Sequence, residues 1–320
     1  MRTRTGALAV ALPLAAALLA SACSSSSSSS GASASASSAP GASSTATITA
    51  IGAENEYTSV ISQVGGKYVK ASAILSNPNT DPHTFEASPA VAQEMSQAKL
   101  VVQNGVGYDD WATTMENAAP DSSRKVINVQ HLLGLPDSTP NPHLWYKPST
   151  MPAVANAIAT DLGQIDPAHA SYYKTNAATF VSSLATWTNA LAAFKAAHPG
   201  TPVAVTEPVS DYTLQAAGAD IMTPWAFQAD IMNGNDPSPQ LVAAQNALFT
   251  QHKVKVFLYN QQVTSSLTAS IIKLANENGI PVVGVYETMP TPGYTYQTWM
   301  EAEVNALNKA VTSKTSTEHL

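Results

Sequence analysis

Short apolar runs alternate with longer amphipathic stretches along most of the chain. The apolar runs are rich in Val and Ile and mostly lack polar alternation, so they predict strands buried on both faces of a parallel sheet. Stretches with apolar residues three and four positions apart predict helices between them. The predicted strands are residues 46–53, 68–75, 100–103, 126–129, 202–206, 254–259 and 280–286. The predicted helices are residues 56–64, 89–98, 111–118, 151–164, 168–197, 239–251, 266–278 and 296–311.

The middle of the chain, residues 151–197, carries no strand pattern. The residue pattern predicts one helix over residues 168–197. Its apolar residues form a single stripe: Phe180, Leu184, Trp187, Leu191 and Phe194. At 1.5 Å per residue, such a helix spans about 45 Å and is long enough to connect two halves of a protein. The alternative is a helix packed within one domain. The pattern as a whole predicts an α/β fold class: two lobes of mainly parallel sheet flanked by helices and joined by one long backbone helix.

The same pattern sets the predicted domain organisation. Residues 46–166 form an N-terminal α/β lobe, residues 167–198 the bridging helix, and residues 199–320 a C-terminal α/β lobe. Ahead of them, residues 1–22 are predicted to be a signal peptide. Residues 23–45 are almost entirely Ser, Ala and Gly, which bury too little to fold and predict a flexible linker.

The leader has a basic start, an apolar run and a small-residue end. Arg2 and Arg4 precede the apolar residues 7–20, which are too few and too rich in Ala for a membrane span. The leader closes on Ala20, Ser21, Ala22 and Cys23, which resemble a bacterial lipobox. Cys23 is therefore the predicted lipidation site, and the protein is expected outside the cytoplasm, lipid-anchored to the bacterial cell membrane. The alternative is a plain secretory signal with a chance cysteine.

The cysteine count and the net charge exclude some kinds of site and partner. The chain has a single cysteine, so it has no internal disulfide and no cysteine-based zinc site. Its net charge is −7, from 15 basic and 22 acidic residues. Removing residues 1–22 takes away two arginines and leaves a net charge of −9. This acidic balance argues against a nucleic-acid partner.

Two histidines occur in similar proline turns. His83 follows a predicted strand in the sequence Asn-Pro-Asn-Thr-Asp-Pro-His, and His143 follows Asn-Pro ahead of a helix. Proline fixes φ and biases the residue before it toward extended geometry, so each turn presents its histidine rigidly. One such histidine is more often an ordinary surface residue, but two similar turns indicate two halves of one site.

Two glutamates follow predicted strands of the other half directly. Glu207 follows residues 202–206 and Glu287 follows residues 280–286. Ligands of open α/β sheets bind beyond the carboxyl ends of the strands, where all four side chains are expected to converge. Two imidazoles and two carboxylates suit Zn²⁺, Mn²⁺ or Fe²⁺. Each glutamate alone is equally well explained as an acid near a helix N-terminus.

The chain resembles the zinc/manganese family of ABC-transporter solute-binding proteins. The resemblance rests on Asp-Pro-His-Thr-Phe-Glu-Ala-Ser-Pro at residues 81–89, on Asn-Pro-His-Leu-Trp at residues 141–145, and on Glu54 with Asn55. It implies a bilobal fold with one bridging helix and a metal buried between the lobes. The metal ligands that it implies are His83, His143, Glu207 and Glu287.

The resemblance implies a receptor that captures Zn²⁺ or Mn²⁺ as transported ligand and delivers it to an ABC permease and its ATPase, without catalysis and as a monomer. Asp81 and Asp211 are candidate acceptors for imidazole N–H groups, and Trp145 and Tyr146 candidate walls of the site. Zinc and manganese are about equally expected as the bound ion, because a carboxylate ligand favours manganese whereas intrinsic affinity favours zinc. The alternatives are a secreted metallohydrolase that uses the same cluster, and a metal-chelate-binding or cell-adhesion protein of the same fold.

Overall fold

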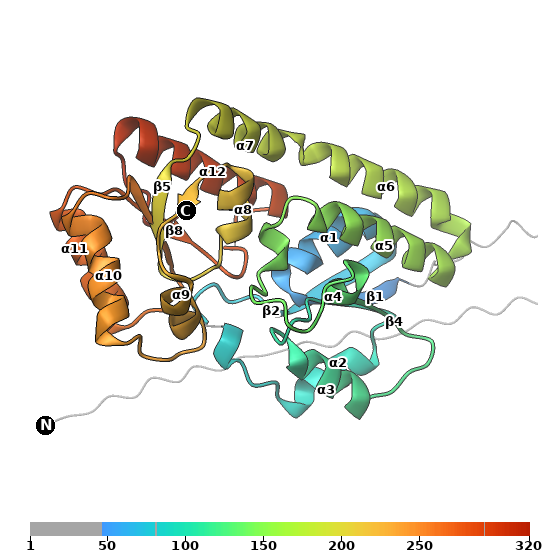
Figure 1. Ribbon diagram of the computed structural model, residues 1–320. Coiled ribbons are helices and arrows are strands. Elements are labelled where there is room, and N and C mark those ends of the chain that lie inside the picture. Colours follow the sequence, from blue (N-terminus) through green and yellow to red (C-terminus); the bar gives the residue numbers. More distant parts are fainter. Residues whose placement is uncertain (1–46, 81, 291) are drawn as a thin grey trace, which may run out of the picture. The chain divides into compact units, whose positions relative to one another are not determined.

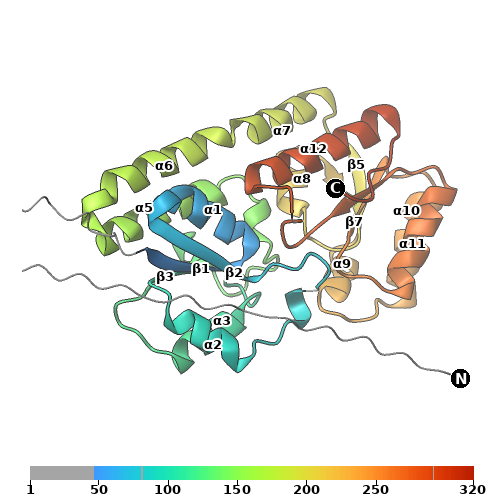
Figure 2. The same cartoon turned by 180° about the vertical axis from the view of Figure 1, so that it is seen from behind.

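The computed structural model describes residues 47–80, 82–290 and 292–320. The predicted signal peptide, Cys23 and the Ser/Ala-rich linker lie outside the described residues, as does Asp81. The described residues form two lobes, each built around a parallel sheet, and Figures 1 and 2 show them from opposite sides. The predicted α/β class is therefore confirmed.

The N-terminal lobe contains the first parallel sheet. Among the described residues its strand order is β2-β1-β3-β4, and every neighbouring pair is parallel. The strands are β1 (Ile48–Glu54), β2 (Val69–Leu75), β3 (Leu100–Gln103) and β4 (Lys125–Asn128). The helices are α1 (Asn55–Gly65), α2 (Pro89–Ser96), α3 (Asp110–Ala118), α4 (Val129–Leu132) and α5 (Thr150–Ile165), with short 3₁₀ turns η1 (Gly66–Tyr68), η2 (Pro82–Thr84) and η3 (Leu144–Tyr146).

The C-terminal lobe repeats this arrangement. Its strand order is β6-β5-β7-β8, again parallel throughout the part that the structure describes. The strands are β5 (Pro202–Val205), β6 (Asp220–Ile221), β7 (Val256–Asn260) and β8 (Val282–Val285), and the helices are α8 (Asp211–Ala216), α9 (Trp225–Met232), α10 (Pro239–Thr250), α11 (Ser266–Glu277) and α12 (Tyr296–Ser313). Strands β7 and β8 are buried along their whole length, as their unbroken apolar sequence predicts.

The bridge between the sheets is helical, but it is divided into two segments. After the turn η4 (Pro167–His169) come α6 (Ala170–Ser183) and α7 (Ala185–Ala197), separated by Leu184. The Ser183 hydroxyl donates to the carbonyl of Phe180 at 2.6 Å, and the Thr188 hydroxyl donates to that of Leu184 at 3.2 Å. These two bonds lie on either side of the point at which the predicted single helix is divided. Figure 1 shows the two segments running one after the other past both lobes.

The apolar stripe of this bridge faces the core. Phe180, Trp187 and Phe194 are each at most 3% exposed. The ring of Tyr296, on α12, lies 6.3 Å from Phe180 and 6.0 Å from Trp187 between ring centroids. One stripe therefore packs against elements from both ends of the chain: α6 contacts α1 and α5, and α7 contacts α12.

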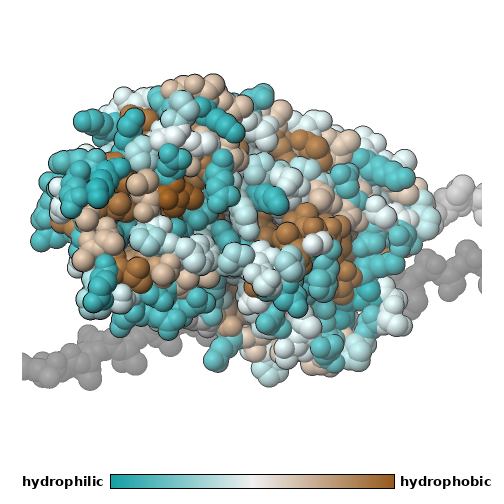
Figure 3. Space-filling model, viewed as in Figure 1, coloured by the Kyte–Doolittle hydropathy of each residue, from teal (hydrophilic) through white to brown (hydrophobic). Residues whose placement is uncertain are grey.

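The surface is mainly polar between scattered apolar patches. Figure 3 shows brown patches separated by teal and white surface on one face. The exposed large apolar residues are Val126, Leu132, Met222 and Trp225. Among the helices that the structure describes, none combines the length and the apolar character needed to cross a membrane.

Candidate metal site

The fold brings residues from distant parts of the chain to the carboxyl ends of the two sheets. His83 lies on η2, after β2, and His143 comes immediately before η3, in the long connection after β4. Glu287 follows β8, two residues beyond its last residue. Parallel strands end at the same edge of a sheet, so each lobe can present side chains from several loops at one place.

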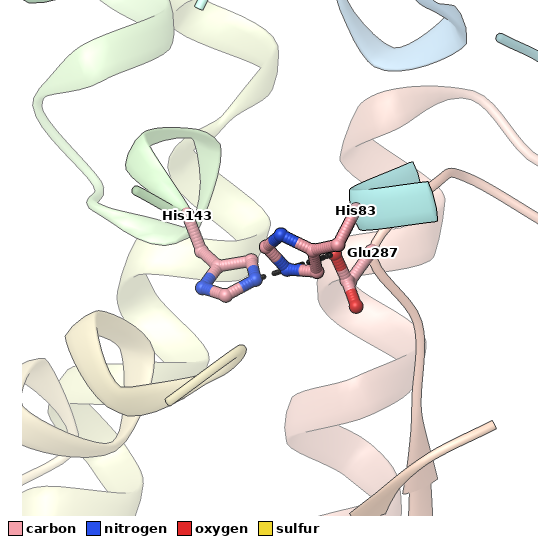
Figure 4. Close-up of side chains that lie close together, drawn as sticks. All are labelled: His83, His143 and Glu287. Atoms are coloured by element: carbon pink, nitrogen blue, oxygen red, sulfur yellow. Dashed lines mark ion pairs between the residues drawn. The ribbon is translucent and has the colours of Figure 1, made fainter. Parts of the chain in front are cut away.

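Three of the four predicted ligands form one cluster. The Nε2 atoms of His83 and His143 lie 3.2 Å and 3.4 Å from Oε2 of Glu287. One ligand atom from each residue lies within 4.8 Å of those of the other two. Figure 4 shows both imidazoles pointing toward the carboxylate, His143 from one side and His83 from the other. His143 and Glu287 are fully buried, whereas the side chain of His83 is 21% exposed.

The local sequence fixes the proton on His143. The amide of Asn141 donates to the carbonyl of Pro208 at 2.8 Å, so its Oδ1 serves as the acceptor. This oxygen lies 3.0 Å from the His143 backbone N–H and 2.8 Å from its Nδ1. Nδ1 therefore carries the proton, and the lone pair is on Nε2. Burial lowers the pKa of His143, which favours this neutral form.

That buried Nε2 supports the fit of a metal ion. It makes no hydrogen bond within the described part of the chain, although it lies 3.4 Å from Oε2 of Glu287. A buried polar atom without a hydrogen bond costs about 1–3 kcal/mol, which a metal bound between the imidazole and the carboxylate would recover. The residues present thus suit a divalent transition metal as ligand.

Hydrogen bonds to the backbone and to both carboxylate oxygens fix the position of Glu287. Its backbone N–H donates to Gln262 Oε1 at 2.6 Å. Its Oε1 accepts the side-chain amide of Asn260 at 2.5 Å, and its Oε2 accepts the Tyr108 hydroxyl at 3.0 Å. Burial by itself would raise the pKa of Glu287, but the imidazoles of His143 and His83 hold it well below its usual range wherever they carry a proton on Nε2. The carboxylate is therefore ionised, as a metal ligand must be.

Aromatic residues close the inner side of the site. Trp145 and Tyr146 are completely buried, and the ring of Trp145 lies 5.4 Å from that of His143. Tyr108 packs edge-on against His83 and His143, with ring centroids 5.2 Å and 5.9 Å away. These rings exclude water and strengthen electrostatic contacts inside.

The outer side of the site borders a cavity. It measures about 300 Å³, and its wall includes His83, Tyr108, Pro142 and Trp225. Trp225 is 43% exposed, so the wall on the side of the C-terminal lobe is accessible to solvent. His83, whose side chain is 21% exposed, therefore connects the cluster to this cavity.

Glu207 is the predicted ligand that the structure does not bring into the cluster. It follows β5, is 2% exposed, and is absent from the group whose ligand atoms lie within 4.8 Å of one another. Its loop nevertheless contacts the His143 turn. Pro208 accepts the amide of Asn141, and the Tyr212 hydroxyl donates to the Asn141 carbonyl at 3.0 Å. Glu207 therefore lies on a segment tied to the site.

Other sequence-based expectations have mixed outcomes. The acceptor for the His143 N–H is Asn141 and not Asp211, whose Oδ1 has no hydrogen-bond partner among the described residues. Asn260, Gln262 and Tyr108 were not expected to hold Glu287. Asn260 directly follows the predicted strand 254–259, at a position where many members of the family that the chain resembles have a glutamate, and it was not expected to be a ligand. No spacing in the sequence relates these residues to Glu287.

The protein has two lobes of parallel sheet joined by a helical bridge. Two imidazoles from one lobe meet a carboxylate from the other. This combination is typical of a bilobal metal-binding protein. The sequence model of the family described as zinc-uptake complex component A, periplasmic, matches residues 52–310. The chain belongs to this family. The resemblance to solute-binding proteins of metal importers is thereby confirmed, and this is a family of binding proteins and not of enzymes.

Relatives and structural neighbours agree with this assignment. The chain is 26% identical over 141 residues to a putative metal-binding protein of Treponema pallidum, covering 38% of this chain and 44% of that protein. It is 23% identical over 228 residues to a putative metal-binding protein of Thermotoga maritima, covering 70% and 79%. The fold matches the solute-binding protein FpvC of Pseudomonas aeruginosa in complex with Mn²⁺, with a TM-score of 0.68, 22% identity, and coverage of 84% and 99%.

Proposed function

We propose that this protein captures a divalent transition metal, Zn²⁺ or Mn²⁺, outside the cytoplasm and delivers it to an ABC permease with its ATPase. The observation that supports the proposal is the convergence of His83, His143 and Glu287, the last two of them fully buried, with ligand atoms within 4.8 Å of one another. Glu207 is the fourth ligand in this proposal, and it reaches the ion by a shift of the loop after β5. Nothing in the structure favours the metallohydrolase or the adhesin.

The donor types support a transition metal over Ca²⁺ or Mg²⁺. Those two ions prefer all-oxygen sites, whereas neutral imidazole nitrogen suits zinc and manganese. The buried, water-excluding surroundings support capture of the ion itself. The relatives' names, which refer to metal binding, agree with this class of ligand.

Release in this proposal uses small movements. Besides the helical bridge, several hydrogen bonds join the lobes directly, among them Tyr108 to Glu287, Tyr146 to Glu303, and the paired bonds of Asn55 with the backbone of Met289. A large hinge opening would break all of them at once. Local displacement of the loops that carry Glu207 and His83 opens the site at lower cost.

The binding test uses the full chain stripped of metal by a chelator and titrated calorimetrically with Zn²⁺ or Mn²⁺. We expect one ion per chain, and a loss of affinity on the order of 100-fold, about 2.8 kcal/mol, for His143→Ala. His131→Ala, which changes an exposed histidine on α4, is the matched control and should bind as the wild type. Absence of stoichiometric binding, or equal affinity in His143→Ala, would contradict the proposal.

The proposed attachment of the protein to the outer face of the cell membrane depends on Cys23. If the leader is cut before Cys23 and lipid is added there, mass spectrometry of the membrane-extracted protein should show a lipid-modified N-terminal cysteine. Cys23→Ser should abolish the modification and release the protein from the membrane fraction, whereas Ser24→Ala should leave both unchanged. Membrane retention of Cys23→Ser would refute the anchor and leave the metal site unaffected.

A further inference from the structure

The two oxygens of the Glu287 carboxylate have different surroundings. Oε2 faces the metal cluster, 3.2 Å and 3.4 Å from the imidazole nitrogens and 3.0 Å from the Tyr108 hydroxyl. Oε1 accepts the amide of Asn260 at 2.5 Å. One carboxylate oxygen therefore faces the imidazoles, and the other is hydrogen-bonded to Asn260.

The orientation of Asn260 is fixed by its other bonds. Its Oδ1 accepts the backbone N–H of Gln262 at 2.9 Å, so its Nδ2 must be the atom that donates to Glu287. Its own backbone N–H donates to the Thr206 hydroxyl at 3.1 Å. Asn260 ends β7, is 1% exposed, and forms part of a strand that is buried throughout. It cannot rotate away without leaving several buried groups unpaired.

The number of oxygens that a carboxylate contributes matters for metal choice. Zinc is satisfied by four ligands in a tetrahedron, each carboxylate giving a single oxygen. Manganese favours more oxygen ligands and octahedral geometry, which a carboxylate binding through both oxygens helps to complete. A donor fixed on Oε1 keeps that oxygen away from the ion.

We propose that Asn260 is a positioning residue that restricts Glu287 to binding through Oε2 alone and thereby biases the site toward zinc over manganese. This inference rests on the proposed function, because it concerns the same ion. Asn260 does not touch the ion, and its influence passes entirely through the carboxylate that it holds.

The test compares wild type with Asn260→Ala and Asn260→Leu, each as the full chain stripped of metal. Both variants remove the amide donor, and the Leu variant keeps a side chain of similar size in the buried position. Competition against a chromophoric chelator gives the Zn²⁺ and Mn²⁺ affinities separately. We expect the ratio of zinc to manganese affinity to fall about tenfold in both variants, mainly through tighter manganese binding, because the freed Oε1 can then also bind the ion.

A second readout separates this role from a merely structural one. Co²⁺ bound to the wild type should show the intense visible absorption of four-coordinate cobalt, and the variants should show the weaker bands of a higher coordination number. Asn156→Ala, at an exposed asparagine of α5 away from the site, should leave the ratio and the spectrum unchanged. Thermal unfolding checks that the variants are folded, and the Leu variant decides if the Ala variant is not.

The outcomes distinguish the two proposals. If the wild type binds both metals but the affinity ratio and the cobalt spectrum stay unchanged in the variants, the role of Asn260 is refuted and the proposed function stands. If both affinities fall equally, Asn260 is only structural and the inference is again refuted. If the wild type binds neither metal, the proposed function fails and this inference fails with it.

Discussion

The two lobes share one strand order but contribute different chemistry to the site. The N-terminal sheet, ordered β2-β1-β3-β4, supplies imidazoles, and the C-terminal sheet, ordered β6-β5-β7-β8, supplies the carboxylate. An imidazole ligand needs an acceptor for its far N–H, and Asn141 provides it for His143. A carboxylate ligand needs donors, and Asn260 provides one for Glu287. Each lobe therefore surrounds its ligand with groups of the opposite hydrogen-bonding kind.

An asparagine stands at equivalent places in the two lobes. Asn104 comes directly after β3, and Asn260 ends β7, the corresponding strand of the other sheet. Asn104 accepts the Tyr57 hydroxyl at 2.6 Å and donates to the Pro142 carbonyl at 2.8 Å, next to His143. Asn104 thus fixes a ligand through the backbone, whereas Asn260 touches the ligand side chain itself. The comparison shows how one fold position can act on stability in one lobe and on the ligand in the other.

Buried acids differ between the lobes as well. In the N-terminal lobe, burial raises the pKa of Glu54 well above its usual range, and Asp109 and Glu56 nearby raise it further. In the C-terminal lobe, Glu303 accepts the Tyr146 hydroxyl at 2.7 Å and the Trp299 indole N–H at 2.8 Å. Burial nevertheless raises the pKa of Glu303 to about 8. Burial therefore raises the pKa of both acids, and Glu303, with a pKa of about 8, is largely protonated at neutral pH.

The largest effect is expected from Glu303→Gln. Because the folded-state pKa of Glu303 is raised to about 8, its contribution to stability is complete below its unfolded value and is lost as the pH rises through 8. Glutamine keeps an acceptor for Tyr146 and Trp299 without ionising. Relative to wild type, the variant should gain on the order of 3 kcal/mol between pH 5 and pH 8.

Thermal unfolding of the metal-free protein from pH 5 to pH 9 measures this gain. Glu277→Gln, at an exposed acid that lies 3.7 Å from Lys273, is the control and should follow the wild-type curve. If Glu303→Gln and wild type lose stability in parallel over this range, Glu303 is not the acid responsible.

A somewhat smaller change in stability is expected from Asn104→Ala, which tests the comparison between Asn104 and Asn260. The substitution takes the acceptor from the buried Tyr57 hydroxyl and one of two donors from the Pro142 carbonyl, which keeps the Leu144 N–H, so it should destabilise the fold by about 1–3 kcal/mol. Asn156→Ala, at an exposed asparagine of α5, should change stability by no more than about 0.5 kcal/mol. Urea unfolding gives both values. A change in the zinc-to-manganese ratio with unaltered stability would show that Asn104 acts as Asn260 is proposed to act.

The sequence was sufficient to predict the alternation of strands and helices, because strands buried on both faces leave unbroken apolar runs. It also pointed to His83 and His143, since proline turns are local. The two-residue strand β6 was missed because Asp220 and Ile221 carry no detectable period. The bonds of Asn260 and Tyr108 to Glu287 depend on how loops meet across the two lobes, which no local pattern records. The place of Glu207 outside the cluster depends on loop conformation in the same way.

The last helix belongs structurally to both halves. Gln297 of α12 exchanges hydrogen bonds with Gln63 of α1, and the hydroxyl of Tyr296 donates to the carbonyl of Trp145 at 2.6 Å. During synthesis from the N-terminal end, the first lobe is therefore complete in sequence long before its core is complete in space. A chain that lacked α12 would lose contacts both at Gln63 and at Trp145, two residues after His143. The N-terminal lobe therefore depends on the end of the chain for part of the support beneath its own ligand.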